Sequence, residues 1–215
     1  MRSGINLLII YIILLSFYNC ARQMVKKPLT EQEVLDKIPR WQENYNEKSG
    51  TGVLIISSPK YRNSSYFSSK YDVNTKVLSG KLLGSFGITV GSFYFSPDSV
   101  SVIDIEGKEI KEQILYILGD LPHDVLSMFI AWDIPLSSKW RVIPLERGWA
   151  LIGNNIEVSI SPEFLPYYVS IYQNNNSSIE YTSYKTVSGI KQPFRIIAKK
   201  GKNMLEIEYH KMKLQ

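Results

Sequence analysis

The side chains that most often perform chemistry are scarce in this chain. Cys20 is the only cysteine among 215 residues, and the two histidines, His123 and His210, lie far apart in the sequence. One cysteine cannot form an internal disulfide and cannot by itself build a thiolate zinc site. The two histidines do not have the spacing of metal ligands. We therefore expect neither a metal ion nor a cofactor.

Ser57 and Lys60 form the string S-x-x-K, which contains the nucleophilic serine of penicillin-recognising enzymes. That chemistry needs the serine at the start of a helix, together with companion S-D-N and K-T-G strings. Here Pro59 lies inside the string, a strand-like segment precedes it, and the sequence has no companion string. We interpret the string as coincidental and predict that the protein is not an enzyme.

Cys20 closely follows the apolar N-terminal segment. Arg2 precedes an uninterrupted apolar run over residues 7–15. The run is shorter than the roughly 20 residues of a membrane-spanning helix, and it has the length and positive start of a secretory signal peptide. An apolar run that ends in a lone cysteine resembles a bacterial lipoprotein signal, in which the thiol receives a diacylglyceryl group. The alternatives are a signal anchor, or a signal peptide cut elsewhere with Cys20 incidental.

These patterns divide the chain into a signal peptide over residues 1–19, a polar tether over 20–29 and one domain over 30–215. Two or more acyl chains on the cysteine, at about 0.8 kcal/mol per buried CH₂, would anchor the domain stably to a membrane. The formal net charge of +5 is compatible with an anionic membrane or an acidic partner. The lysines are dispersed and no nucleic-acid-binding string is present, so we expect no nucleic-acid partner.

The domain begins with helical spacing and then changes to strands. Thr30 and Glu33 form a capping box for a helical segment that would run to Tyr45 and that Pro39 should bend or split. Short strand-like segments follow from Gly50, separated by Gly, Ser-Pro or Asn-rich turns. Strands and helices do not alternate, so the sheet should be antiparallel, and about ten to eleven twisted strands tend to curl. We predict an α+β fold, a curled antiparallel half-barrel with an N-terminal helix.

Two helical segments interrupt the strands and could cover the open side of the half-barrel. The first ends at Gly119 and the second begins at Pro122. The segment after them, residues 133–149, has no period and predicts a loop or the edge of a lid. Apolar candidates for the lid or cavity are Ile114, Leu118, Leu126, Phe129, Ile130 and Trp132. The alternative for Trp132 is an ordinary core residue.

Three stretches carry a resemblance to a known family: KLLGSFGITVGSFYFSPDSVSVIDIEGKEI, LGDLPHDVLSMFIAWDIP and SIEYTSYKTVSGIKQPFRIIAKKGKNMLEIEYHKMKL. Their order and spacing over residues 31–214 resemble the LolA/LolB superfamily of lipoprotein-localisation factors. The LolB-like outer-membrane lipoprotein receptors and related uncharacterised bacterial lipoproteins are the most similar members.

The resemblance implies a half-barrel whose apolar cavity accepts the acyl chains of lipoproteins. It implies a lipid-anchored protein at the periplasmic face of the outer membrane, with a periplasmic LolA-like carrier as a partner. A protruding turn in such receptors carries an apolar residue that helps to insert cargo into the membrane. The matching residue is Phe86, between Gly84 and Gly87. The alternative is an aromatic residue folded onto the sheet in a tight hairpin.

Two other functions fit the same sequence. One is a non-catalytic scaffold or interaction lipoprotein of an envelope complex, in which large side chains fill the concave face. The other is a carrier of a different apolar ligand. A cavity too narrow for a methylene chain would favour the scaffold.

Overall fold

The computed structural model describes residues 29–60, 62–109, 112, 116, 123–134, 139–153, 155–172 and 177–215. The chain divides into two units, Met1–Thr30 and Glu31–Gln215, and the second contains the fold. The predicted signal peptide, Cys20, Ile114 and Leu118 all lie outside the described residues.

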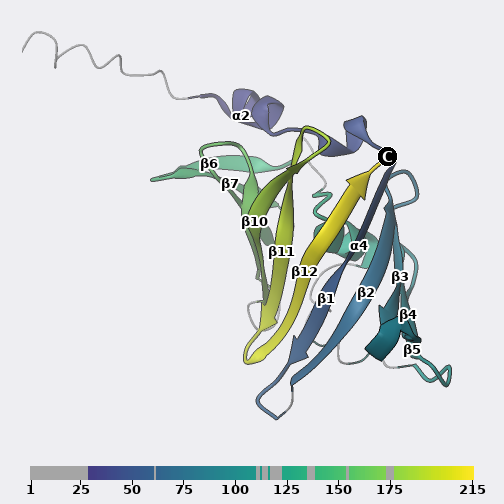
Figure 1. Ribbon diagram of the computed structural model, residues 1–215. Helices are drawn as coiled ribbons and strands as arrows, with labels where there is room; N and C mark the ends of the chain where they lie inside the picture. Colours follow the sequence, from purple (N-terminus) through teal and green to yellow (C-terminus); the bar gives the residue numbers. More distant parts are fainter. Residues whose placement is uncertain are drawn as a thin grey trace, which may run out of the picture. The chain divides into compact units, whose positions relative to one another are not determined.

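The second unit is built almost entirely of strands (Figure 1). Its elements are α2 (Glu31–Lys37), η1 (Trp41–Asn44), β1 (Glu47–Ser57), β2 (Arg62–Asp72), β3 (Val77–Leu83), η2 (Ser85–Gly87), β4 (Thr89–Phe95), β5 (Val100–Asp104), α4 (His123–Ala131), β6 (Arg141–Leu145), β7 (Gly148–Gly153), β8 (Ile156–Ile160), β9 (Pro166–Ile171), β10 (Ser177–Val187), β11 (Ile190–Lys200) and β12 (Asn203–Leu214).

The twelve strands of the described residues belong to one antiparallel sheet in the order β5-β4-β3-β2-β1-β12-β11-β10-β9-β8-β7-β6. Strands that follow one another in the sequence are paired, apart from β5 and β6. Strand β1 also pairs with β12, which joins the first and last strands at the centre. Strands β5 and β6 are the two edges, so the sheet is not closed into a barrel. The predicted antiparallel sheet is confirmed.

The prediction of ten to eleven strands was wrong, because it did not include strand β6. Residues 133–149 were predicted to form a loop, but Arg141–Leu145 pairs with β7. Pro144 lies inside β6, and a proline cannot donate a hydrogen bond to a neighbouring strand. The strand is possible because β6 has a partner on one side only. In an edge strand of only five residues that contains a proline, the alternation of apolar and polar residues is too short to be recognised in the sequence.

The central seam between β1 and β12 depends on a glycine. The register shifts between Thr51 and Gly52, so β12 places an extra residue opposite this point. A Cβ atom at Gly52 would lie 1.9 Å from the carbonyl oxygen of Glu208. Only glycine allows the two backbones to approach so closely. The bulge interrupts the pairing of the two central strands, and bulges of this kind increase the local twist of a sheet.

Helix α2 is shorter than the predicted segment to Tyr45. It ends at Lys37, ahead of Pro39, and a 3₁₀ turn follows at Trp41–Asn44. A proline cannot donate the helical hydrogen bond and disfavours helical backbone in the residue before it. Val34 and Ile38 are 1% exposed, and α2 packs against β6.

Helix α4 ends in a Schellman motif formed by two backbone hydrogen bonds. Asp133 N–H donates to the carbonyl of Met128 at 2.7 Å, and Trp132 N–H donates to that of Phe129 at 3.2 Å. Trp132 adopts φ 61°, a left-handed conformation that glycine usually supplies. The motif satisfies carbonyls at the helix end and turns the chain so that Trp132 and Asp133 are both buried.

The sheet bends around α4, which lies behind β12 and β1 in the view of Figure 1. The Tyr181 hydroxyl of β10 donates to the carbonyl of Phe129 at 2.8 Å. Lys48 Nζ of β1 donates to the carbonyl of Ala131 at 2.9 Å. Strands β10 and β1 are separated by two other strands, and both reach the same short helix. The face that contacts α4 is therefore concave, as in a half-barrel.

Candidate functional site

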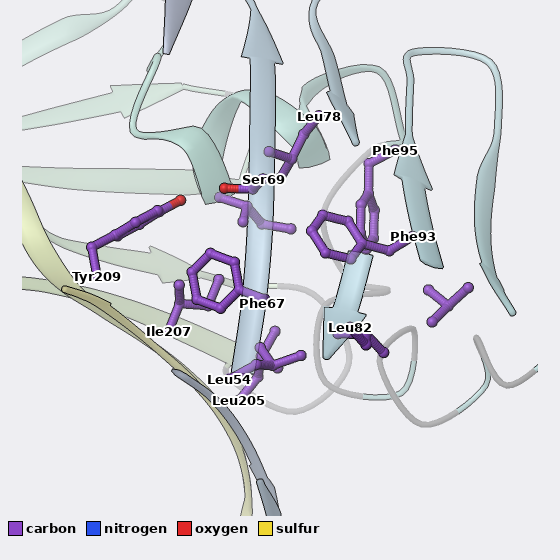
Figure 2. Close-up of a pocket in the computed structure, with 12 residues that line it drawn as sticks. Leu54, Phe67, Ser69, Leu78, Leu82, Phe93, Phe95, Leu205, Ile207 and Tyr209 are labelled. Carbon is purple, nitrogen blue, oxygen red and sulfur yellow. The ribbon is translucent and has the colours of Figure 1, made fainter. Parts of the chain in front are cut away.

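A narrow apolar pocket lies between the concave face and α4 (Figure 2). Its cavity volume, the space open to the centre of a water-sized sphere, is about 40 Å³. One water needs roughly 10–15 Å³ on this measure, so the pocket is a slot for a few atoms. The described residues that line it are Leu54, Phe67, Ser69, Leu78, Leu82, Phe93, Phe95, Val102, Ile130, Leu205, Ile207 and Tyr209.

The two-residue period of the strands brings these side chains to one face. On β2, Phe67 and Ser69 face the pocket, and on β4, Phe93 and Phe95 do so. Tyr94, between the two phenylalanines, is exposed. Val102 and Ile130 add walls from β5 and α4, so six strands and one helix contribute to the site.

The pocket has an open end and a closed end. Leu54 and Leu82 are half-buried, whereas Phe67, Leu78 and Phe95 are buried at 4% exposure each. Figure 2 shows Leu54 and Leu82 at one end and Leu78 at the other. Leu82 lies on β3 shortly before Gly84, where the chain turns toward β4. The open end therefore lies near the β3–β4 turn.

Aromatic contacts hold the pocket walls in place. The rings of Phe67 and Tyr209 meet edge to face, with their centroids 5.3 Å apart. Phe93 and Phe95 are tilted at 5.9 Å between centroids. Edge-to-face geometry is favourable between aromatic rings, by about 0.5–1.5 kcal/mol beyond the buried area. These residues give the slot a defined width in the absence of ligand.

The predicted lid and cavity residues that the structure describes all lie in or directly after α4. Leu126, Phe129, Ile130 and Trp132 are 0–4% exposed. Ile130 is the one of these four that lines the pocket. The Trp132 ring packs against Tyr184 at 5.5 Å between centroids. The sequence could not separate the single cavity residue from its core neighbours, because all four are apolar and helical.

A buried polar cluster lies beyond the closed end of the pocket. Asp133 is 2% exposed, and its Oδ2 accepts hydrogen bonds from the Tyr71 hydroxyl at 2.5 Å and from Lys76 Nζ at 2.8 Å. Lys48 is 3% exposed and donates to the carbonyl of Ala131. These contacts hold the end of α4 against β1, β2 and the β2–β3 turn. We call the residues Lys48, Tyr71, Lys76 and Asp133 the polar clamp.

Burial shifts the titration of the groups around the clamp. It lowers the pKa of Lys48 to about 7, against a partial opposing effect of the Asp133 carboxylate. Burial also raises the pKa of Tyr71, assisted by the charge of Asp133 and by its hydrogen bond to that carboxylate. It raises the pKa of Tyr209 to about 12. The tyrosines of this region therefore stay neutral well above neutral pH, while Lys48 titrates near it.

The β3–β4 turn exposes an apolar tip. Phe86 is fully exposed, Ile88 is 61% exposed and Val90 is 37% exposed. Phe86 adopts φ 59°, and Gly87 adopts φ 75°. A bulky side chain in left-handed backbone is uncommon, so the turn holds Phe86 outward at a conformational cost. Gly84, Phe86 and Gly87 thus lie in an exposed turn, and the Phe86 ring does not fold onto the sheet.

Sequence reasoning missed the polar clamp and most of the pocket. Tyr209 alternates with Glu208 and His210 near the end of the chain, and this two-residue period could have identified it as inward-facing. Asp133 lies in a segment without helical or strand periodicity, so no sequence pattern indicated that its side chain is buried. Among the described residues, no group of three His, Cys, Asp or Glu side chains could hold a metal ion. No helix in this part of the chain is long and apolar enough to span a bilayer.

No protein-family model and no curated protein sequence matches the chain. Solved structures do match it. The LolA superfamily protein NE2245 from Nitrosomonas europaea has a TM-score of 0.54 at 12% identity, over 87% of this chain and 94% of that chain. A domain named for outer membrane lipoprotein sorting, from Vibrio parahaemolyticus, has a TM-score of 0.53 at 11% identity, over 86% and 90%.

This chain has a LolA-like fold. The likeness covers most of this chain and nearly the whole of each matched structure. It confirms the predicted resemblance at the level of the fold. In the LolA-like sheet of this protein, the pocket lies on the half of the concave face formed by β1–β5 and β12, and the Phe86 turn projects near the pocket's open end.

Proposed function

We propose that the protein binds acyl chains in the pocket and passes them to or from a membrane at the β3–β4 turn. This proposal rests on the arrangement of two features, the apolar pocket and the exposed β3–β4 turn. A slot lined by apolar side chains is open at the end where Phe86, Ile88 and Val90 project. An acyl chain could move between bilayer and pocket beside apolar surface, without crossing the polar clamp.

The energetics allow both binding and release. Each methylene moved from water into an apolar site contributes about 0.8 kcal/mol, and ordering the chain and the protein offsets part of that gain. A bilayer offers the same acyl chain an equally apolar environment. Transfer therefore needs no catalysis and no cofactor, and we propose a non-enzymatic binding protein.

The cellular role that fits is reception or insertion of lipoproteins at the periplasmic face of the outer membrane. Three arguments support it: the LolA-like fold, a leader that resembles a lipoprotein signal ending at Cys20, and the exposed turn. A diacylglyceryl group on Cys20 would keep the turn close to a membrane. A periplasmic LolA-like carrier would supply the cargo.

The test is a titration with a synthetic diacylated lipopeptide that displaces a fluorescent acyl probe. Leu82 lines the pocket, and Leu83, its neighbour on β3, does not. Leu82→Lys places a charge in the slot, whereas Leu83→Lys makes the same change on the other face of the strand. We expect Leu82→Lys to abolish displacement and Leu83→Lys to retain it. Equal effects of the two substitutions would contradict binding in this pocket.

A scaffold role is the second candidate, and the narrowness of the slot favours it. Phe129 and Trp132 fill the space around α4, and about 40 Å³ holds only part of an acyl chain unless the walls move. The scaffold predicts no displacement by lipopeptide at any concentration. It also predicts normal localisation of other lipoproteins when the cell is depleted of this protein, whereas the receptor role predicts their mislocalisation.

A further inference from the structure

One end of the sheet carries two turns that are rich in basic side chains. The turns after β1, β3 and β11 leave the sheet at the same end, because alternate strands of an antiparallel sheet run in the same direction. Figure 1 shows the β1–β2 and β11–β12 turns together at the lower end of the sheet. The basic residues of these two turns and of the adjoining strand ends are Lys60, Arg62, Lys199, Lys200 and Lys202. We call these five residues the basic rim.

The strand register places the two turns side by side. Arg62 of β2 lies opposite Ser57 of β1, which lies opposite Met204 of β12. Met204 in turn lies opposite Lys199 of β11. Residues directly opposite one another share a face of the sheet, and three strand spacings place the Cα atoms of Arg62 and Lys199 roughly 14 Å apart. Leu205, the neighbour of Met204, lines the pocket, so this row lies on the opposite, convex face.

Most of the charge of the basic rim is not balanced by nearby carboxylates. Lys199 pairs with Glu180 at 3.2 Å. Lys60, Arg62 and Lys202 are exposed, and none of the three forms an ion pair with a described residue. The carboxylates that follow β5 at this end are at least three strands from the rim, roughly 14 Å, which exceeds the screening length of about 8 Å at physiological ionic strength.

Exposed aromatic side chains lie beside the basic rim. Tyr66, on the same strand and face as Arg62, is 57% exposed. It lines a shallow hollow of about 260 Å³ together with Phe86 of the β3–β4 turn and His210 of β12. Tyrosine rings favour the interface between membrane and water, and basic residues close to a membrane attract anionic lipids. Cations beside exposed aromatic rings therefore fit a bilayer surface better than an acidic protein.

We propose that the basic rim binds the phosphate head groups of anionic phospholipids, while Phe86 enters the apolar layer beside them. This inference rests on the proposed membrane contact of the β3–β4 turn and adds the class of lipid that the protein selects. Each basic residue close to an anionic membrane strengthens the contact roughly fivefold. Salt screens this attraction but does not weaken the insertion of an apolar ring. Dependence on lipid charge and on salt therefore distinguishes the rim from contact through Phe86 alone.

The experiment is lysine footprinting of the full chain on vesicles. The vesicles contain phosphatidylcholine alone or an equal mixture of phosphatidylcholine and phosphatidylglycerol. A water-soluble reagent acetylates accessible lysines, and mass spectrometry maps them on the protein that floats with the vesicles. The readout is thus the orientation of bound protein and not the amount bound. Lys60 and Lys202 report on the rim, and the exposed Lys191 and Lys213, toward the other end of β11 and β12, are internal controls.

We expect Lys60 and Lys202 to react at least about fivefold more slowly on the anionic vesicles than on phosphatidylcholine, the factor for one basic residue. The rates are normalised to those of Lys191 and Lys213. High salt should remove the protection, since the attraction is screened. Equal normalised rates on the two kinds of vesicle would overturn the proposal and leave an acidic protein as the partner that fits the rim.

Two double variants with the same change in net charge test the rim itself. Lys60→Gln with Arg62→Gln removes two rim charges, and Lys213→Gln with Arg147→Gln removes two charges toward the opposite end of the sheet. All four residues are exposed, and surface substitutions of this kind seldom change stability. The rim variant should weaken the contact roughly 25-fold and abolish the protection of Lys202, whereas the control variant should retain it. Unchanged protection of Lys202 in the rim variant would overturn the proposal.

The lipopeptide titration separates this inference from the proposed function, because no residue of the basic rim lines the pocket. If the lipopeptide displaces the acyl probe and the rim lysines are not protected, the anionic-lipid site fails and the acyl pocket stands. If the rim lysines are protected and the lipopeptide displaces nothing, the anionic-lipid site stands and acyl binding fails. If neither is seen, both fail.

Discussion

The two halves of the sheet bury their concave faces differently. In the half that contains β7–β10, the inward residues Leu151, Val158, Ile160 and Val169 are all 0% exposed. In the half that contains β1–β5 and β12, Leu54, Leu82 and Phe93 are only half-buried and leave a slot between them. The same architecture thus provides a closed core on one side and an incompletely filled one on the other.

The difference indicates a division of labour within one sheet. A fully packed face contributes stability, because each buried aliphatic side chain contributes about 1.5–3 kcal/mol. A half-filled face gives up part of that contribution and leaves apolar surface for a ligand. The polar clamp holds the end of α4 against β1 and β2 in the half with the slot, and α4 also contacts β10 in the other half. Loss of the clamp should therefore affect the packing of α4 against both halves of the sheet.

Substitution of Asp133 should have the largest effect on stability. Asp133→Ala removes the acceptor of Tyr71 and Lys76 and takes away the charge that partly balances buried Lys48. Removal of one partner from a buried charged pair costs about 3–5 kcal/mol. We expect the free energy of unfolding to fall by an amount near the lower end of this range, since Lys76 is 30% exposed. Urea unfolding measures it, and a loss below about 1 kcal/mol would show that the clamp does not join the two halves.

Leucine-to-alanine substitutions in the two halves of the sheet should lower the free energy of unfolding by different amounts. Leu151→Ala empties a fully buried site and should cost about 3 kcal/mol, within the range for buried leucines. Leu54→Ala, at the rim of the slot, should cost about 1 kcal/mol, because less contact is lost. Denaturant titration of both variants gives the comparison directly. Equal losses would mean that the slot is as well packed as the closed half.

The pH dependence of stability should report on Lys48. The pKa of Lys48 is about 7 in the folded protein and about 10.5 in the unfolded chain. Between these values the unfolded state binds the extra proton, so the free energy of unfolding should rise with pH, by at most about 1.4 kcal/mol per pH unit. Above about pH 10 the buried tyrosines reverse the trend, since they ionise more readily when unfolded.

Thermal unfolding between about pH 7 and pH 9.5 tests this dependence. Lys48→Met is the control, because it removes the titrating group and should flatten the profile over that window. A profile of Lys48→Met that rises as steeply as that of the wild type would assign the dependence to another group.

The exposed turn should contribute least to stability. Phe86 is fully exposed, so Phe86→Ala should change the free energy of unfolding by no more than about 0.5 kcal/mol. The same substitution should weaken binding to phospholipid vesicles, because an apolar ring is lost from the tip. Ile105 is also a strongly exposed apolar residue, and Ile105→Ala serves as a comparison outside the turn. Retained vesicle binding by Phe86→Ala would remove the turn from the proposed transfer route.

Much of the fold was predictable because strands and turns leave local signals. Strand-like segments bounded by turn residues predicted about ten to eleven of the strands, and Gly84 and Gly87 lie in the β3–β4 turn. Strand β6 escaped because Pro144 lies in a short edge strand. The clamp escaped for a different reason: Tyr71 and Asp133 are 62 residues apart and meet only in the folded chain. The slot is lined by Ile130 of α4 together with residues of six strands, and no local sequence pattern encodes how these elements come together.

The most direct test of acyl binding in the pocket is photo-crosslinking with a lipopeptide that carries a diazirine in its acyl chain, followed by mass-spectrometric mapping of the labelled residues. Binding in the slot predicts labels on Leu54, Leu82 and Ile207, which line it on three different strands. Competition by unlabelled lipopeptide should remove them. Labels confined to exposed residues, or labels that do not compete, would contradict the acyl pocket and leave the scaffold as the better description of this protein.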